Sequence, residues 1–302
     1  MKSFTSLRNL FGSLANNTES TVLTLADELI NDATRSILTM KNWWFLERTT
    51  TISTVAAQQY VNIPANTERV VSVLVTIGTQ QYTPVSIASR EEWNLINQST
   101  STQSNTPEFY FVENGRLYFF PTPSSTTSNA VSLTHRIRVS DLSLADYTTG
   151  NVSAVTNGAT TVTGSGTTWT SAMAGRWLKI TPTSTAAASG DNLWYEISSV
   201  ASTTSLTLTR AYLGVTISAN TAYTIGEVSL LPEAYQDLPL HKALSVYFTS
   251  VQPEAGRASA YLQMYQDGLA RLTSDNGNRD MNPVIDYGVE RPYINPNLVL
   301  SL

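Results

Sequence analysis

The side chains able to bind a metal or move a proton are few and widely spaced in this 302-residue sequence. It contains two histidines, His135 and His241, and no cysteine. His135 falls in a segment with the period of a strand and His241 in one with the period of a helix, so their spacing indicates no shared metal site. Without cysteine, disulfides, thiolate zinc sites and cysteine nucleophiles are excluded. We expect two ordinary, partly buried histidines, no metal and no cofactor.

Paired carboxylates, which hydrolases of the cell wall use, are the other chemistry to consider. Two pairs are close in sequence, Asp141 with Asp146 and Asp191 with Glu196. Any acidic chain contains such pairs, and no HExxH, GxSxG or Walker A motif accompanies them. Residues 164–166 (GSG) have no lysine after them and are interpreted as a hairpin loop. The sequence therefore predicts no catalytic residue.

A third candidate is a group of aromatic residues between positions 169 and 212. Such residues form sugar-binding platforms, but the cores of small β-domains use the same types. Their sequence context favours core packing and leaves the platform as an alternative. The group comprises Trp169, Trp177, Trp194, Tyr195 and Tyr212.

The composition favours contact with proteins over contact with nucleic acid. Only 14% of the residues are charged, against roughly 25% in an average soluble protein. The net charge is −5 and no basic run occurs, which argues against wrapping nucleic acid. Neither a membrane-spanning segment nor a signal-like apolar core is predicted. A surface rich in Thr, Ser, Asn and Gln suits a structural assembly subunit, although Thr-rich strands alone would give the same composition.

The first predicted element is a helix from about Val22 to Trp44, capped by Thr21 or Thr24. Its apolar stripe comprises Val22, Leu25, Leu29, Ala33, Ile37, Met40 and Trp44. It leads into WWFLE, where two adjacent tryptophans cannot face the same core. We expect one to pack inward, and both Trp43 and Trp44 are candidates for a contact between subunits.

From residue 49 to 138 the apolar period becomes two, which predicts strands. One strand places Val71, Val73, Val75 and Ile77 on a single face. A turn is expected at residues 64–66 (PAN), and Ser89 with Glu92 forms a capping box for a short helix. Asn114-Gly115 predicts a type I′ hairpin, and a further strand is expected over residues 132–139.

Residues 150–226 contain six short strand patterns with turn residues about every ten positions. This spacing predicts a small β-sandwich or barrel inserted into the body. The helical period then returns in a hairpin of two helices. Its stripes comprise Leu240, Leu244, Tyr247, Phe248 and Val251, then Ala258, Tyr261, Leu262, Tyr265, Leu269 and Leu272.

From Asn276 onward the pattern predicts an extended arm interrupted by prolines. A free tail normally lacks so many apolar residues, so we expect a partner surface to cover them. The candidate contact residues are Pro283, Val284, Ile285, Tyr287, Val289, Pro292, Tyr293, Ile294, Leu298, Val299, Leu300 and Leu302.

The expected fold is α+β. A discontinuous body over residues 1–147 and 227–275 carries a helix, a β-layer and a helical hairpin. It is joined by an inserted all-β domain over 148–226 and the arm over 276–302.

The order of several motifs resembles the head-to-tail adaptor proteins of tailed bacteriophages, also called connector or tail tubular proteins. These motifs are WWFLE, YVNIP, SREEWNLIN, PEFYFVENGRLYFFPTP, VSLTHRIRVSDL and LLPEAYQDLPLHKAL, in this order. The resemblance covers about residues 20–147 and 226–275. The inserted segment, with NVSAVTNGATTVTGSGTTW and WYEISSV, also resembles a small β-module of phage virion proteins.

The resemblance implies a virion protein at the head–tail junction, assembled in the host cytoplasm and without catalytic residues. Its implied partners are the portal protein, about twelve copies of itself in a ring, and a downstream tail or nozzle protein. Double-stranded DNA would pass through without specific binding, and no membrane is involved. Two alternatives remain: a receptor- or glycan-binding tail protein that acts through the inserted β-domain, and a cell-wall enzyme.

Overall fold

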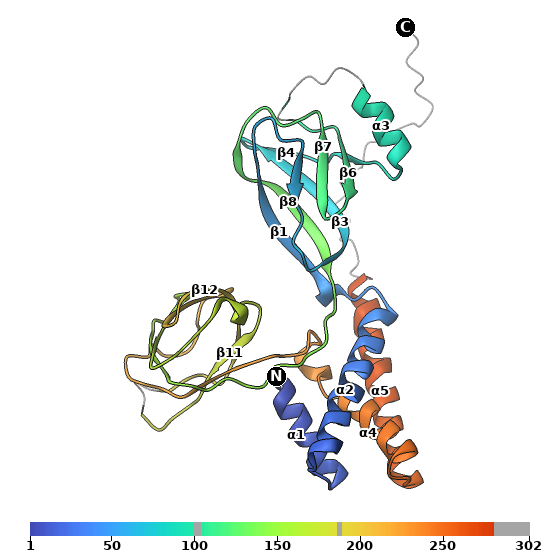
Figure 1. Cartoon of the computed structure of the whole chain (residues 1–302), viewed down its shortest axis with the longest axis vertical. Coiled ribbons are helices and arrows are strands. Elements are labelled where there is room, and N and C mark those ends of the chain that lie inside the picture. Colours follow the sequence, from blue (N-terminus) through green and yellow to red (C-terminus); the bar gives the residue numbers. More distant parts are fainter. Residues whose placement is uncertain (99–103, 105, 186–188, 281–302) are drawn as a thin grey trace, which may run out of the picture.

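Four helices pack together in the lower part of the molecule (Figure 1). The computed structural model describes residues 1–98, 104, 106–185 and 189–280. The buried apolar side chains of the helices recur every three or four positions, so each helix turns one stripe toward the others. The helices are α1 (Phe4–Ala15), α2 (Ser20–Met40), α4 (Leu238–Ser250) and α5 (Ala255–Asp280).

Helix α1 was not predicted, and α2 differs from the prediction at both ends. Ser3 caps α1 through its side chain, which accepts a hydrogen bond from the Ser6 N–H. Helix α2 begins at Ser20 after Glu19, which makes no side-chain cap, so the predicted threonine caps are wrong. It ends at Met40, and Trp44 instead opens a 3-10 turn, Trp44–Leu46.

The helical hairpin is confirmed, with two corrections to its buried stripes. Val251 and Leu262 are exposed, whereas Tyr247, Phe248, Tyr265 and others of the predicted stripes are buried. Phe248 stacks on Tyr261 with 5.9 Å between ring centroids, which joins the two helices.

Helix α5 also continues past the predicted start of the arm, to Asp280. Asn276 is the physical reason: its side-chain oxygen accepts from the Trp44 N–H, and its amide donates to the Asn42 carbonyl, each at 3.3 Å. These bonds attach the last turns of α5 to the WWFLE segment. The remainder of the predicted arm, residues 281–302, lies outside the described residues.

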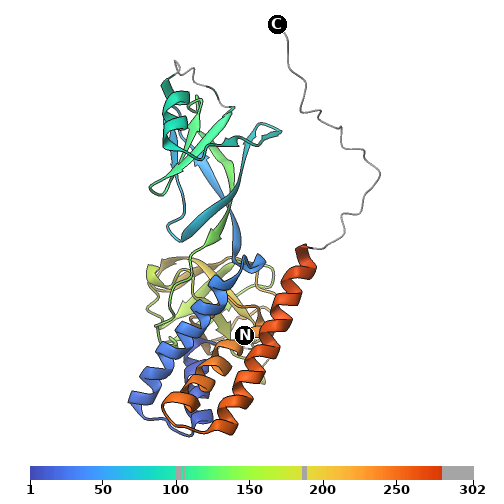
Figure 2. The same ribbon diagram turned by 90° about the vertical axis from the view of Figure 1, so that its right-hand side faces the viewer.

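Two four-stranded sheets face each other above the helices (Figures 1 and 2). Their apolar faces enclose one core, which includes Val73, Val75, Leu117, Phe119 and Leu133. The first sheet has the order β1 (Glu47–Thr54), β8 (Thr127–Ile137), β3 (Thr67–Ile77) and β4 (Gln80–Tyr82). The second has the order β2 (Tyr60–Asn62), β7 (Arg116–Phe120), β6 (Phe109–Glu113) and β5 (Val85–Ser86).

The predicted alternation along β3 fails at one position. The register against β8 shifts between Val70 and Ser72, so Val71 points outward and is 43% exposed. Val70 instead packs against the core that holds Val73 and Val75. A bulge inserts one residue and thereby exchanges the faces of the positions before it, which period-two reasoning cannot detect.

The turn and cap predictions in this region are confirmed. Asn114 and Gly115 both have positive φ, 49° and 71°, as a type I′ turn between β6 and β7 requires. The Ser89 hydroxyl accepts from the Glu92 N–H at 3.1 Å and caps α3 (Arg90–Gln98). Trp93 of α3 stacks on Phe111 of the second sheet, with ring centroids 5.6 Å apart.

The six strands predicted between residues 150 and 226 are present in one sheet. Its order is β14 (Tyr223–Gly226), β11 (Trp177–Ile180), β12 (Trp194–Ser202), β13 (Ser205–Leu208), β10 (Thr161–Ser165) and β9 (Asn151–Val155). Antiparallel bridges join Tyr147 to Ile225, Val152 to Thr221 and Val155 to Ile217. Because these bridges join the two ends of the strand order, the sheet closes on itself. We call residues 147–226 the barrel.

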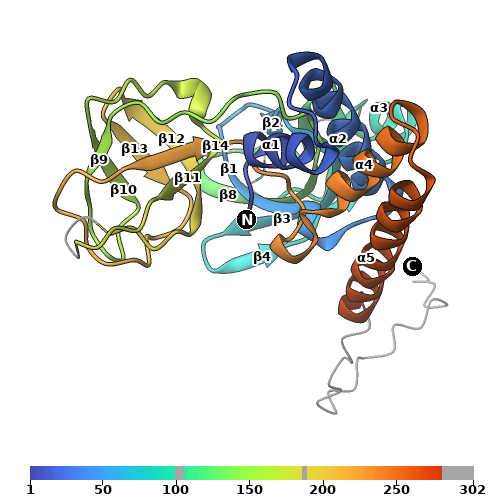
Figure 3. The ribbon, with the colours of Figure 1, turned by 90° about the horizontal axis from the view of Figure 1, so that it is seen from below.

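The barrel has a hydrophobic core of its own, built from Val162, Leu178, Ile197, Leu206 and further apolar residues. It lies beside the helices and below the two sheets (Figures 1 and 3). Two connections join it to the rest of the chain: residues 138–146, which follow β8, and residues 227–231, which follow β14. The mixed α+β fold is thereby confirmed.

Candidate functional site

His135 and His241 lie in different parts of the fold. The ring of His135 lies within 3.2 Å of the Thr50 hydroxyl and 2.9 Å of the Thr67 hydroxyl, so it links β1, β8 and β3. Burial lowers its pKa, and the charge of Arg48 lowers it further. Burial also lowers the pKa of His241, whose ring stacks on Tyr261 of α5. Both histidines therefore act as packing residues.

The two candidate carboxylate pairs are separated by other partners. Asp141 forms an ion pair with Arg35 at 2.7 Å, whereas Asp146 accepts from the Ser3 hydroxyl at 2.8 Å. Asp191 accepts a hydrogen bond from the Tyr195 hydroxyl and another from the Leu193 N–H. Within the described part of the chain, no group of three or more His, Cys, Asp or Glu residues is placed to hold a metal ion.

Most of the aromatic residues considered as a sugar platform are buried, and Trp169, Tyr195 and Tyr212 belong to the core of the barrel. Trp169, Trp194, Tyr195 and Tyr212 are each no more than 7% exposed. The Trp169 ring nitrogen donates to the Tyr223 hydroxyl at 2.8 Å, and burial raises the pKa of both Tyr195 and Tyr212 to about 12. Four of the five rings thus offer no open face to a sugar.

The two adjacent tryptophans take opposite environments, as expected. Trp43 is 1% exposed and donates from its ring nitrogen to the Ile37 carbonyl at 2.7 Å. Because its own subunit encloses this ring, Trp43 offers no surface to a neighbour. Trp44 is 36% exposed and lies beside the end of α5. The twelve candidate contact residues from Pro283 to Leu302 lie outside the described residues.

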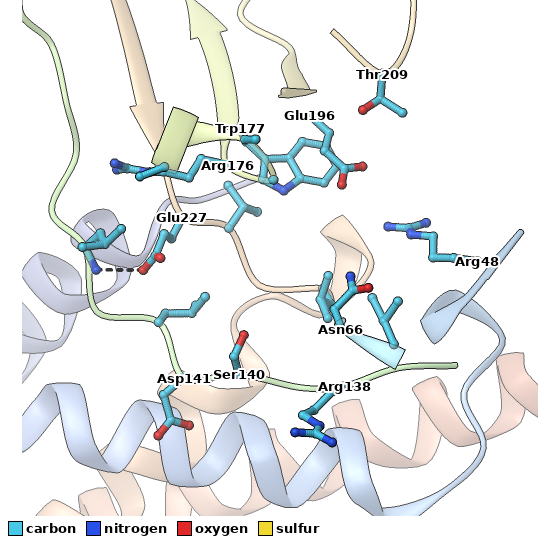
Figure 4. Close-up of a pocket in the computed structure, with 18 of the residues that line it drawn as sticks. Arg48, Asn66, Arg138, Ser140, Asp141, Arg176, Trp177, Glu196, Thr209 and Glu227 are labelled. Carbon is cyan, nitrogen blue, oxygen red and sulfur yellow. Dashed lines mark hydrogen bonds between the residues drawn. The ribbon is translucent and has the colours of Figure 1, made fainter. Parts of the chain in front are cut away.

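A cleft of about 570 Å³ separates the first sheet from the barrel (Figure 4). Residues from the start of β1 line one wall: Arg48, Thr49 and Thr50. The barrel contributes Trp177 and Glu196 to the opposite wall. The two connections to the barrel form its base, with Ser140, Asp141, Leu144, Glu227 and Val228 among the lining residues.

The charged side chains of the cleft fall into two groups. Glu227 at the base accepts from the Ser143 and Leu144 N–H groups, at 2.6 and 2.8 Å. Arg48 and Glu196 instead project into the cleft from opposite walls (Figure 4). Neither forms an ion pair within the described residues. Within the described residues, the cleft therefore presents charges of both signs to an occupant, Arg48 on one wall and Glu196 on the other.

Arg176 fixes the base of the cleft. Its guanidinium donates to the carbonyls of Ala145 at 2.7 Å and Ile225 at 3.0 Å, and thereby joins the connection that enters the barrel to the last barrel strand, β14. Burial lowers its pKa, while the nearby carboxylates of Glu227 and Asp146 act in the opposite direction. The guanidinium thus serves as a structural cross-link.

The N-terminal residues complete this junction, and we call residues 1–5 the strap. Ser3 bridges to Val228 in the exit connection, and its hydroxyl donates to Asp146 in the entry connection. The Phe4 N–H donates to the Glu227 carbonyl at 2.7 Å. The strap therefore contacts both connections at once.

Sequence reasoning missed both the cleft and the strap. Each is assembled from segments more than a hundred residues apart, such as Arg48 with Glu196 and Ser3 with Asp146. A periodic pattern reports only local contacts, so no signal in the sequence pointed to these pairings.

Comparisons with known proteins support the resemblance in part. No curated protein matches the chain. Among the described residues, no helix combines the length and the apolar character needed to cross a bilayer. Residues 2–157, more than half of the chain, match the family model described as SU10 adaptor protein, and the chain therefore belongs to this family of phage adaptor proteins.

Proposed function

We propose that this protein forms a ring between the portal and the tail of a phage particle, joins head to tail and leaves a channel for DNA. The family match over residues 2–157 is the observation that carries the proposal. The α+β fold adds support, because a ring needs a rigid unit, and the strap, Arg176 and Asn276 join its parts by partly buried hydrogen bonds.

The charge of the chain supports passage of DNA without retention. At −5 per chain, a ring of about twelve copies carries about −60. A strongly basic lumen would hold phosphates and slow the genome. The implied partners remain the portal, adjacent copies of this chain and a downstream tail or nozzle protein.

The contacts between subunits are expected to be mostly apolar. Met40 and Trp44 are 46% and 36% exposed, and the Trp44 N–H is bound to Asn276 near the end of α5, where the residues of the predicted arm begin. We propose that the arm, from residue 281 to 302, joins this subunit to the portal or to the adjacent adaptor. Proteins commonly use an exposed apolar surface of this kind for assembly.

The barrel is proposed to face the outside of the ring. Its two connections leave the body close together at Ser3, so it is attached at one end only. Its sequence likeness to a β-module of phage virion proteins is consistent with a place on the particle surface. A sugar-binding role is not proposed, because four of its five candidate platform residues are buried.

The test uses a variant ending at Asp280 in comparison with the full chain. The truncation keeps Asn276 and its bonds to the WWFLE segment, so the body should remain folded. We expect the full chain, mixed with portal-containing heads, to form rings seen by mass photometry and electron microscopy. The shortened chain should stay monomeric and fail to complete particles.

A second variant ending at Thr273 is the matched comparison. It removes Asn276 and should lower the melting temperature as well as abolish docking. A chain ending at Asp280 that still docks and completes the particle would reject the role of the arm. Failure of the folded, full-length protein to bind portal under all conditions would reject the adaptor role.

A further inference from the structure

The terminal strands of the two sheets differ greatly in length. β4, β2 and β5 contain three, three and two residues, whereas β1 contains eight. Natural sheets commonly keep their edge strands short, because an open row of backbone N–H and C=O groups attracts another strand. The barrel is closed, so it presents no comparable edge. Among the described residues, β1 is therefore the exceptional terminal strand.

The sequence of β1 is suited to pairing. It reads ERTTTIST, with no proline or glycine, and its register with β8 is regular from Glu47 to Ile52. Within the described residues, the backbone of Arg48 through Ile52 pairs with β8 alone. β3 also extends beyond β4, but its register shifts twice over that stretch, a device that disrupts pairing along an edge. The regular open edge belongs to β1.

The cleft lies beside the first half of this edge. Arg48, Thr49 and Thr50 of β1 line it, and Trp177 and Glu196 of the barrel face them. An extended segment added to β1 would thus have backbone partners on one side and side-chain partners on the other. The volume of the cleft, about 570 Å³, lies within the range of roughly 300–1,000 Å³ typical of ligand-binding clefts.

The chain itself contains a segment with matching chemistry. Residues 281–302 carry Asp286 and Glu290, which complement Arg48, and Arg291, which complements Glu196. The segment ends in LVLSL (Leu298–Leu302), whose alternating apolar residues are typical of an added strand. Charge and pattern therefore both suit the cleft.

The length of the C-terminal segment favours binding to a neighbouring copy over binding to the subunit that carries the segment. Asn276 attaches α5 next to Trp44, only three residues before β1 begins at Glu47. Seventeen residues, 281–297, then separate α5 from LVLSL and reach roughly 55 Å when extended. β1 spans only roughly 26 Å. The extended reach of residues 281–297 is thus about twice the length of β1. A linker of this length is suited to reach the next subunit of a ring.

We propose that the C-terminal segment of one copy binds as an added strand along β1 in the cleft of the adjacent copy. This inference rests on the proposed ring and assigns the binding surface within it. The β1 backbone supplies sequence-independent hydrogen bonds to LVLSL, and Arg48 and Glu196 attract the oppositely charged residues that precede it in the segment. Each subunit then donates one segment and receives another, which closes a ring of head-to-tail contacts.

The absence of native cysteines makes disulfide mapping a direct test. A T51C chain, altered on the exposed side of β1, is mixed with an L300C chain under mild oxidation. We expect a disulfide between the two chains. The matched control is V71C, an exposed position on the other open stretch, in β3; it should form far less cross-linked product with L300C.

A binding measurement gives an independent readout. A fluorescent peptide of residues 281–302 should bind the chain that ends at Asp280, as measured by anisotropy. The R48E variant should bind about tenfold more weakly, and V71A should bind like the parent. Equal cross-linking at Thr51 and Val71, or binding unaffected by R48E, would overturn the proposal.

The double variant T51C/L300C distinguishes binding of the C-terminal segment to its own subunit from binding to a neighbouring copy. A cross-linked monomer at high dilution would show that the segment binds its own subunit, which rejects the neighbouring copy. Portal docking of the full chain tests the proposed function separately. Docking without a cross-link rejects only the cleft, whereas a cross-link without portal binding rejects the adaptor role.

Discussion

The indole nitrogen of Trp194 in the barrel donates a hydrogen bond to the backbone carbonyl of Met1, 2.9 Å away. This contact joins residues 193 positions apart and links the barrel to the strap. The strap also donates from the Lys2 N–H to the Gln236 side chain at 2.7 Å, just before α4. Residues 1–5 thus lie between the barrel and the helices and determine how one sits on the other.

Replacing Trp194 by phenylalanine should loosen this junction. Loss of one hydrogen bond costs about 0.5–1.5 kcal/mol. Amide hydrogen exchange should increase in the two connections, residues 138–146 and 227–231, and stay unchanged in the barrel strands. The matched control is W177F, a half-buried tryptophan of the same barrel, which should leave the connections protected. Equal exchange in both variants would contradict a role for the strap.

Gly226 should tolerate no side chain. A Cβ there would lie 2.7 Å from Asp146 Oδ1 and 2.8 Å from Ser3 Cβ, so the strap and the entry connection would have to move. We expect G226A to lose about 1–3 kcal/mol of unfolding free energy. The control is G256A at the start of α5, where a Cβ meets open space and alanine favours the helix. Denaturant unfolding measures both, and similar stabilities would contradict the close packing.

Deleting the barrel should leave a folded body. Ser3 contacts both Asp146 and Val228, so a short linker can join these two residues. The variant lacking residues 147–227 should keep the helical signal in circular dichroism and elute as a soluble protein. Because the barrel has its own core, residues 147–226 should also fold when expressed alone. Loss of helical signal on deletion would place the barrel within the core of the body.

Arg136 should matter more than the carboxylate that pairs with it. Its guanidinium contacts the Leu38 carbonyl at 2.9 Å, the Asn42 side chain at 2.7 Å and Glu68 at 3.0 Å. Because the guanidinium is buried, R136A leaves buried acceptors unsatisfied and should cost about 3 kcal/mol. Glu68 is 46% exposed and can be solvated, so E68Q should cost less than about 1 kcal/mol. Thermal unfolding of both variants provides the measurement.

The two histidines should make the protein less stable in mild acid. Their pKa values are lowered in the folded state relative to about 6.5, so the unfolded chain takes up protons first as the pH falls. Their contribution is thus fully present above pH 6.5 and is lost as the pH falls through the folded pKa values. We expect a smaller decline in unfolding free energy between pH 7.5 and 5.5 for H135Q/H241Q. A parallel decline in both proteins would contradict this origin.

Local features were predictable because neighbouring residues alone determine them. The Asn114-Gly115 turn requires two residues that tolerate positive φ, and Ser89 needs only the N–H of Glu92 to cap α3. The six short strands of the barrel follow from alternation and turn residues in the same way. The sequence predicted that one of the two adjacent tryptophans is buried but not which one, and the structure identified Trp43 as the buried one.

The remaining features depended on contacts between distant segments. The bulge at Val71 arises from the register with β8, and α5 extends to Asp280 with Asn276 bound to Asn42 and Trp44. The cleft exists because β1 and β12 meet across the two connections, with Arg48 facing Glu196. Periodicity encodes which face of an element is apolar, but packing decides which elements meet. The sequence by itself determined most of the helices and strands, because neighbouring residues specify them, whereas only the tertiary structure brought β1 and the barrel together across the cleft, because packing joins residues far apart in the chain.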